Sequence, residues 1–345
     1  MPTALASRPE RPRLRSLGLW LCSALFVASS VWIALATART AATAPSAGPT
    51  LIELRGATLE VELDPEPFDL SHATLIEWVQ TSARAVESFY GRFPVARARV
   101  RLIPVRGKGV VTGRTEAWDG ARIDVRVGIA SDRGDLTRDW IMVHEMVHLA
   151  FPSVPRAHHW IEEGLATYVE PLARLEIGEV TPERVWLDLV NGLPNGLPQT
   201  GDRGLDLTPT WGRTYWGGAL FCLLAELKIR RRTNDAKGLR DALRGILAAG
   251  GRMTKRWPLE KALAEGDRAL GIEVLMPLYM QMRASPYPVD LERLWHDLGI
   301  ERTAEGLRFH DDAPLAATRR AITRVEPAAA PRSGSEPRQE PASNK

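Results

Sequence analysis

The pentapeptide His144-Glu145-Met146-Val147-His148 is the stretch that decides which fold to expect from this sequence. On a helix with 3.6 residues per turn, positions four apart share one face, so both histidines can direct an imidazole nitrogen at one ion. Glu145 then lies beside that ion without binding it. The pattern predicts a helix that carries two metal ligands and a free carboxylate.

The residues around the pentapeptide are apolar, which predicts that its helix is buried. Trp140 to Val143 precede the first histidine and Leu149 to Phe151 follow the second, enough for about three helical turns. Asp135 is the expected N-cap, and Pro152 ends the helix. Polar side chains on such a helix are costly to bury unless a bound cation compensates them.

A third protein ligand is expected further along the chain, because zinc in catalytic sites takes three protein ligands and keeps its fourth position for water. Fourteen residues lie between His148 and Glu163, which opens an apolar, helix-compatible stretch. Glu162 is adjacent to Glu163. Neighbouring positions on a helix point about 100° apart, so only one of the two glutamates can bind the same ion.

Other third ligands fit the sequence less well. A metzincin-type site needs Gly and His three and six residues after the second histidine, but Phe151 and Val154 stand there. That class is excluded. His158 and His159 match no ligand spacing, and we expect both to lie in a loop or at the surface.

The segment from Trp160 to Glu170 resembles the W-x-x-E-G-x-A-x-Y-V-E segment of the gluzincin zinc peptidases, notably the aminopeptidase N-type family and the smaller peptidase-MA-like bacterial proteins. The resemblance implies that Glu163 is the third ligand of one zinc ion per chain, beside His144 and His148. It implies that Glu145 is the general base. The gap before Glu163 is shorter than in the aminopeptidases and is similar to that of the compact members.

A second segment, Thr214 to Phe221, is similar to the Y-x-K-G segment of the aminopeptidase N-type enzymes. The resemblance implies that Tyr215 stabilises the oxyanion of the tetrahedral intermediate. Gly217 replaces the Lys of that pattern. The alternative is that Tyr215 only packs at the base of the apolar helix that follows, although a buried Tyr usually finds a partner for its hydroxyl.

The function implied by these segments is zinc-dependent hydrolysis of peptide bonds in a peptide or protein substrate. Aminopeptidase and endopeptidase action both remain open, since the exopeptidase motif of the family is not recognisable in 113–120. The alternative is an exported binding or scaffold module that keeps the fold without catalysis. A scaffold has no use for Glu145 and Tyr215, which favours the enzyme.

The N-terminus has the charge-then-apolar order of a targeting segment. Four arginines between positions 8 and 15 precede an apolar run at 17–38, long enough to span a bilayer. Ala36-Thr37-Ala38 is also an acceptable cleavage site, so residues 1–38 are a signal peptide or an N-terminal membrane anchor. Either places the remaining chain outside the cytoplasm, in the periplasm or at the cell surface.

The rest of the chain divides into a linker at 39–50, a catalytic domain at 51–324 and a disordered tail at 325–345, as its composition shifts indicate. Alternating apolar residues predict strands near 59–63, 99–102 and 123–127, and a helix lies between the first two behind Ser71. Helices are predicted at 183–190, 215–232, 238–249, 259–270, 274–282 and 289–298.

The expected fold class is therefore α+β: a small mixed-sheet lobe followed by a helical lobe, a thermolysin-like gluzincin catalytic domain with the zinc site at the junction. By analogy with that fold, the strand at 122–128 lines the cleft and pairs with the substrate backbone. The net charge is only +3, and no nucleic-acid motif accompanies the basic residues, so we expect no nucleic-acid partner. The eleven tryptophans are expected to be packing residues.

Overall fold

The computed structural model describes residues 48–117 and 119–325. The predicted targeting segment 1–38, most of the linker at 39–50, and nearly all of the tail at 325–345 lie outside these residues. No helix among the described residues is long and apolar enough to cross a membrane.

A five-stranded mixed sheet forms the first part of the fold, in the order β1–β2–β3–β5–β4. Strands β2, β3 and β5 run parallel, and β1 and β4 pair antiparallel at the two edges. The three predicted strands are confirmed as β2, β3 and β5, whereas β1 and β4 were not predicted. The bounds are β1 (Thr50–Leu54), β2 (Ala57–Leu63), β3 (Arg97–Val105), β4 (Val110–Glu116) and β5 (Ala121–Gly128).

The sheet has one apolar and one charged face, because side chains alternate along a strand. Inward residues such as Leu59, Val100 and Ile123 are fully buried and share one core with helices α1 (His72–Tyr90) and α3 (Ile141–His148). On the other face, Arg101 bonds to Asp64 at 2.6 Å. The buried face thus provides the platform for α3, which carries the two histidines.

The helix α3 begins later than the sequence suggested. Asp135 belongs to a separate short helix, α2 (Arg133–Thr137), where it forms a capping box with Asp132. Asp139 is the residue that caps α3: its carboxylate accepts hydrogen bonds from the amides of Ile141 and Met142 at 2.9 and 3.0 Å. The predicted N-cap at Asp135 is wrong because Asp135 belongs to a separate helix, α2, which ends at Thr137 before Asp139 caps α3.

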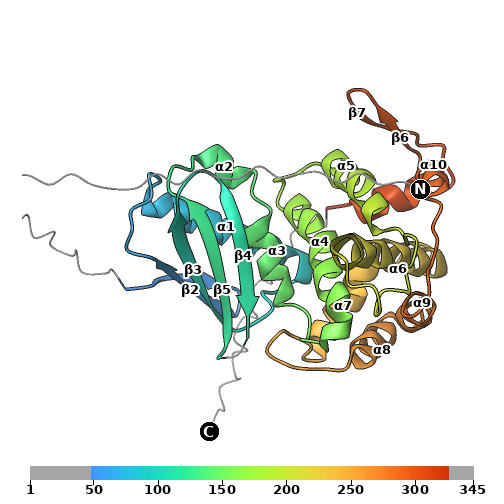
Figure 1. Cartoon of the computed structure of the whole chain (residues 1–345), viewed down its shortest axis with the longest axis horizontal. Helices are drawn as coiled ribbons and strands as arrows, with labels where there is room; N and C mark the ends of the chain where they lie inside the picture. The colour runs from blue at the N-terminus through green and yellow to red at the C-terminus, as the bar shows by residue number, and fades with distance from the viewer. Residues whose placement is uncertain (1–47, 118, 326–345) are drawn as a thin grey trace, which may run out of the picture. The chain divides into compact units, whose positions relative to one another are not determined.

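The second part of the fold is helical and gathers on the side of α3 and β4 (Figure 1). All six helices predicted after residue 182 are confirmed with bounds within a few residues, and the predicted α+β class is confirmed. The elements are α4 (His159–Glu176), α5 (Pro182–Gly192), α6 (Gly218–Thr233), α7 (Leu239–Ala248), α8 (Leu259–Leu270), α9 (Leu275–Met282), α10 (Leu291–Leu298), α11 (Ala316–Ile322) and the hairpin β6 (Ile300–Thr303)–β7 (Gly306–Phe309).

Helices α4 and α6 cross with their backbones in contact. A methyl group added at Gly164 would lie 2.3 Å from the Cα of Gly218, and one added at Gly218 would lie 2.1 Å from the carbonyl oxygen of Trp160. Only glycine permits this approach, because it has no Cβ. The crossing brings the chain just before α6, which holds Tyr215, next to the first turn of α4, which holds Glu163.

Candidate metal centre

The two histidines of α3 lie side by side at the junction of the sheet and the helical part. Their rings meet edge to face with centroids 4.9 Å apart. The side chain of His144 is 6% exposed and that of His148 is 11% exposed. Helical periodicity therefore places both imidazoles in one buried position, as the spacing predicts.

Glu163 of α4 completes the group. Its Oε2 lies 3.2 Å from Nε2 of His144 and 3.7 Å from Nε2 of His148. One donor atom from each of the three residues lies within 4.8 Å of the others. Tetrahedral zinc with bonds of about 2.0–2.2 Å separates its ligand atoms by roughly 3.4 Å, so the donor set has the chemistry and spacing of a zinc site.

The electrostatics of the group favour the protonation states that bind a cation. Burial opposes the charge of Glu163, but hydrogen bonds from His144 and His159 outweigh burial and hold the pKa of this carboxyl well below its ordinary value. Burial, reinforced by His144, lowers the pKa of His148 to about 3. The result is a carboxylate facing a neutral imidazole, which are the forms that ligate metals.

The carboxylate of Glu145 contacts the edge strand β4. Its Oε2 accepts a hydrogen bond of 2.6 Å from Oγ1 of Thr115, which also lies 2.9 Å from the Glu145 carbonyl. Gly113 leaves room for the side chain, because a methyl group there would lie 2.4 Å from Cγ of Glu145. Burial raises the pKa of Glu145 above its ordinary value, which suits a general base.

Tyr215 lies on a single π-helical turn (Arg213–Gly217) at the start of α6. Turns of this kind often occur at functional sites. Its ring lies 6.4 Å from that of His144, with 24° between the ring planes. Burial, together with the charge of Glu163, raises the pKa of Tyr215 to about 12, so the phenol keeps its proton.

The turn that carries Tyr215 is anchored by a buried ion pair. Nε of Arg213 lies 2.8 Å from Oδ2 of Asp202, and both side chains are almost fully buried. The same guanidinium donates a hydrogen bond to the Gly196 carbonyl. This pairing holds the phenol against the metal group, although nothing in the local sequence marks Asp202 as the partner.

The predicted surface position is confirmed for His159, whose side chain is 52% exposed, but it is wrong for His158. Nε2 of His159 lies 3.2 Å from Oε1 of Glu163, and its Nδ1 lies 3.0 Å from Oε2 of Glu162. His158 is largely buried and bonds to Asp206 at 3.0 Å. Helical spacing from Glu163 was the available signal for His159, since positions four apart share a face.

The predicted substrate strand at 122–128 is also wrong. That strand is β5, which pairs with β3 on one side and with β4 on the other. Its backbone groups are therefore already used within the sheet. The edge of the sheet at the metal group is β4, which lines a cavity of about 490 Å³ together with the following residues: Trp140, Ile141, His144, Glu145, His148, His159, Glu162, Glu163, Tyr215 and Met253.

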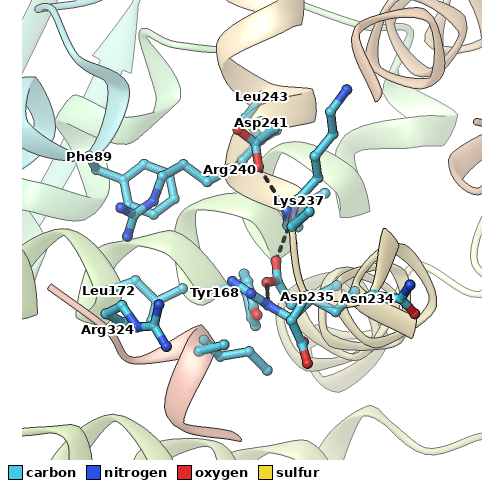
Figure 2. Close-up of a pocket in the computed structure, with 17 residues that line it drawn as sticks. Phe89, Tyr168, Leu172, Asn234, Asp235, Lys237, Arg240, Asp241, Leu243 and Arg324 are labelled. Carbon is cyan, nitrogen blue, oxygen red and sulfur yellow. Dashed lines mark hydrogen bonds and ion pairs between the residues drawn. The ribbon is translucent and has the colours of Figure 1, made fainter. Parts of the chain in front are cut away.

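A second large cavity, of about 500 Å³, lies between α4, the end of α6 and the start of α7 (Figure 2). Several of its charged groups are engaged with one another or with neighbouring residues: Glu226 binds Arg230 and the Leu239 amide, and Arg240 binds Glu176. Among the described residues, only His144, His148 and Glu163 meet the geometry of a metal-binding group. None of these three residues lines this second cavity.

Comparisons with known proteins agree with this architecture. An aminopeptidase N family protein from Idiomarina loihiensis superposes with a TM-score of 0.55 at 13% identity, over 73% of this chain and 49% of that chain. The fold is that of the aminopeptidase N-type catalytic region. An M1 zinc metallopeptidase from Deinococcus radiodurans matches over 70% of this chain and 53% of its own, with 19% identity and a TM-score of 0.44.

The chain spans about half the length of these solved structures. No protein-family profile matches its sequence, and no curated protein is detectably similar to it. At 13% identity, the likeness to the Idiomarina loihiensis protein concerns the fold. The chemistry of this chain has to be argued from its own side chains.

Proposed function

We propose that this chain is a zinc-dependent hydrolase of peptide bonds. The observation that carries the proposal is the convergence of His144, His148 and Glu163 into one donor group, with Glu145 and Tyr215 on either side of it. His144, His148 and Glu163 would hold the zinc, which would supply a Lewis acid for the scissile carbonyl and would lower the pKa of water to about 7.

The residues around the ion perform the proton transfers. Glu145, held by Thr115, accepts a proton from the attacking water and delivers it to the departing amine. Tyr215 keeps its proton at neutral pH and donates a hydrogen bond to the oxyanion as charge develops there. Each group has one task, and the raised pKa of Tyr215 keeps it in the protonated form that its task requires.

The edge strand β4 is the proposed support for the substrate. Only one of its sides pairs within the sheet, so the other side can hydrogen-bond an extended peptide by strand addition. Residues Val111 to Thr115 line the cavity beside the metal group. A peptide bound along this edge would lie in the cavity that Glu145 and Tyr215 also line.

The proposed location is outside the cytoplasm, in the periplasm or at the cell surface. It is supported by the charge-then-apolar order of residues 1–38. If the segment at 17–38 is retained, it anchors the catalytic domain in the inner membrane. Fractionation of the full chain, with the N-terminus of the mature protein sequenced, tests location and cleavage together.

The decisive experiment compares wild type with Glu145→Gln. We expect both proteins to contain one zinc per chain by elemental analysis, and only the wild type to cleave a peptide library. Library peptides with free and blocked N-termini distinguish aminopeptidase from endopeptidase action. Wild-type-like turnover by Glu145→Gln contradicts the mechanism. Zinc binding without cleavage by the wild type favours the alternative, a non-catalytic binding or scaffold module.

A further inference from the structure

A cavity of about 580 Å³ adjoins the metal group on the side of Tyr215. Trp140, His144 and Tyr215 line both this cavity and the one above the metal ligands. The two spaces therefore meet at the place where the scissile bond would lie. Its volume is within the range of pockets that hold small ligands.

Three indole side chains line this cavity, which we call the indole pocket. Trp140 is 50% exposed and Trp211 is 63% exposed, so the expectation of a packing role is wrong for these two. Trp211 lies 6.1 Å from the Tyr215 ring. Trp216 is seated against Gly192, where an added methyl group would lie 2.0 Å from the indole. Large exposed aromatic side chains beside a reactive centre indicate a binding surface.

The charged side chains that line the indole pocket neutralise one another or a neighbour. Arg174 bonds to Glu170 at 3.0 Å, and Arg184 bonds to Asp188 at 2.9 Å. The remaining cation, Arg138, pairs with Asp135 at 2.8 Å. A charged substrate side chain entering this space would lose water and compete with existing ion pairs, which is unfavourable.

We propose that the indole pocket receives one large, uncharged aromatic side chain of the substrate, from a residue next to the scissile bond. This inference rests on the proposed peptidase function and narrows it to peptides with Phe, Tyr or Trp at that position. Aromatic rings favour edge-to-face and offset contacts with other rings, which Trp140, Trp211 and Trp216 provide from two parts of the chain.

The test uses internally quenched peptides that differ at one position, which carries Phe, Trp, Leu, Ala, Asp or Lys. We expect kcat/KM for Phe and Trp to exceed that for Ala, Asp and Lys by about tenfold or more. Mass spectrometry should find cleavage at one constant bond relative to the aromatic residue. Equal rates across the series, or cleavage at varied distances from the ring, overturn the inference.

Variants test whether the indole pocket causes the preference for aromatic side chains. Trp211→Ala removes an exposed ring and should lower the Phe-to-Ala ratio about threefold or more, while Trp211→Phe should retain most of it. Met280→Ala, a matched loss of an exposed apolar side chain on α9 (56% exposed), should leave the ratio unchanged. An unchanged ratio in Trp211→Ala contradicts the assignment.

A binding measurement separates this inference from the proposed function. Phenylalanine amide should quench the tryptophan fluorescence of Glu145→Gln at lower concentration than alanine amide or lysine amide, and Trp211→Ala should weaken the effect. If the wild type cleaves no peptide but phenylalanine amide binds selectively, the proposed peptidase function is contradicted and the aromatic preference of the indole pocket is supported. If the wild type cleaves peptides without aromatic preference, only the pocket inference fails.

Discussion

Replacing Gly113 by alanine should displace the general base without touching a metal ligand. The added methyl group would lie 2.4 Å from Cγ and 2.9 Å from Cδ of Glu145. Carbon atoms in contact prefer about 3.5–4.0 Å, so the carboxylate or the strand must move by about 1 Å. Glu145 has little freedom to yield, because it is buried and Thr115 holds its Oε2 at 2.6 Å.

The expected cost follows from the sensitivity of proton transfer to position. A misplacement of about 1 Å costs about 100-fold in rate, which equals about 2.7 kcal/mol in activation free energy. General-base catalysis as a whole contributes about 100- to 10,000-fold. We therefore expect kcat of Gly113→Ala to fall about 100-fold, with one zinc per chain retained.

The assay is steady-state hydrolysis of a fluorogenic peptide, with zinc measured in parallel. Gly48→Ala is the matched control, because an added methyl group there meets no atom within 4 Å. In a Glu145→Gln background, Gly113→Ala should cause no further loss, since both changes act on one group. A wild-type kcat in Gly113→Ala refutes the reasoning, and so does an additive loss in the double variant.

Four further outcomes are expected. Tyr215→Phe should lower kcat by about 100- to 1,000-fold with zinc retained, and loss of zinc instead would mean that the phenol has a packing role. His159→Ala should weaken zinc binding by about 10- to 100-fold in chelator competition, because the contact between His159 and Glu163 is lost. His159→Gln should lose less zinc affinity than His159→Ala. An unchanged zinc affinity in His159→Ala would contradict a role of His159 in positioning Glu163. Gly164→Ala should lower the free energy of unfolding by about 1–3 kcal/mol in urea, because the added methyl group would lie 2.3 Å from Gly218; an unchanged value would contradict the close crossing of α4 and α6. Zinc at 1,000 times its Kd should stabilise the folded protein by about 4 kcal/mol. Removing zinc with a chelator should therefore lower the unfolding temperature. An unchanged unfolding temperature would argue against a bound metal.

Helical periodicity together with the family resemblance was enough to predict the candidate ligand group. The i, i+4 spacing of His144 and His148 is set by the helix itself, and the resemblance at 160–170 supplied Glu163. The structure brings these three residues together as expected. The strands at 59–63 and 123–127 were equally predictable, because a half-buried strand alternates apolar and polar side chains.

Features that depend on pairing between distant segments were not predictable from these patterns. Strand β4 reads as polar and irregular, since it is an edge with few buried side chains. The sequence of β4 does not indicate that β4, rather than β5, is the edge strand beside Glu145. The cap of α3 was also missed, because the sequence pattern did not show that a separate helix, α2, ends before Asp139.

The sequence by itself determined the chemistry available to this protein: two histidines on one helical face, a carboxylate between them, and a third ligand at the start of the next long helix. The tertiary structure decided what surrounds that chemistry. Thr115, His159 and Trp211 reach the site from separate elements, through strand pairing and the glycine-mediated crossing of α4 and α6. The periodicity of a segment shows which face of its own helix or strand a residue occupies, but not which distant element packs against that face.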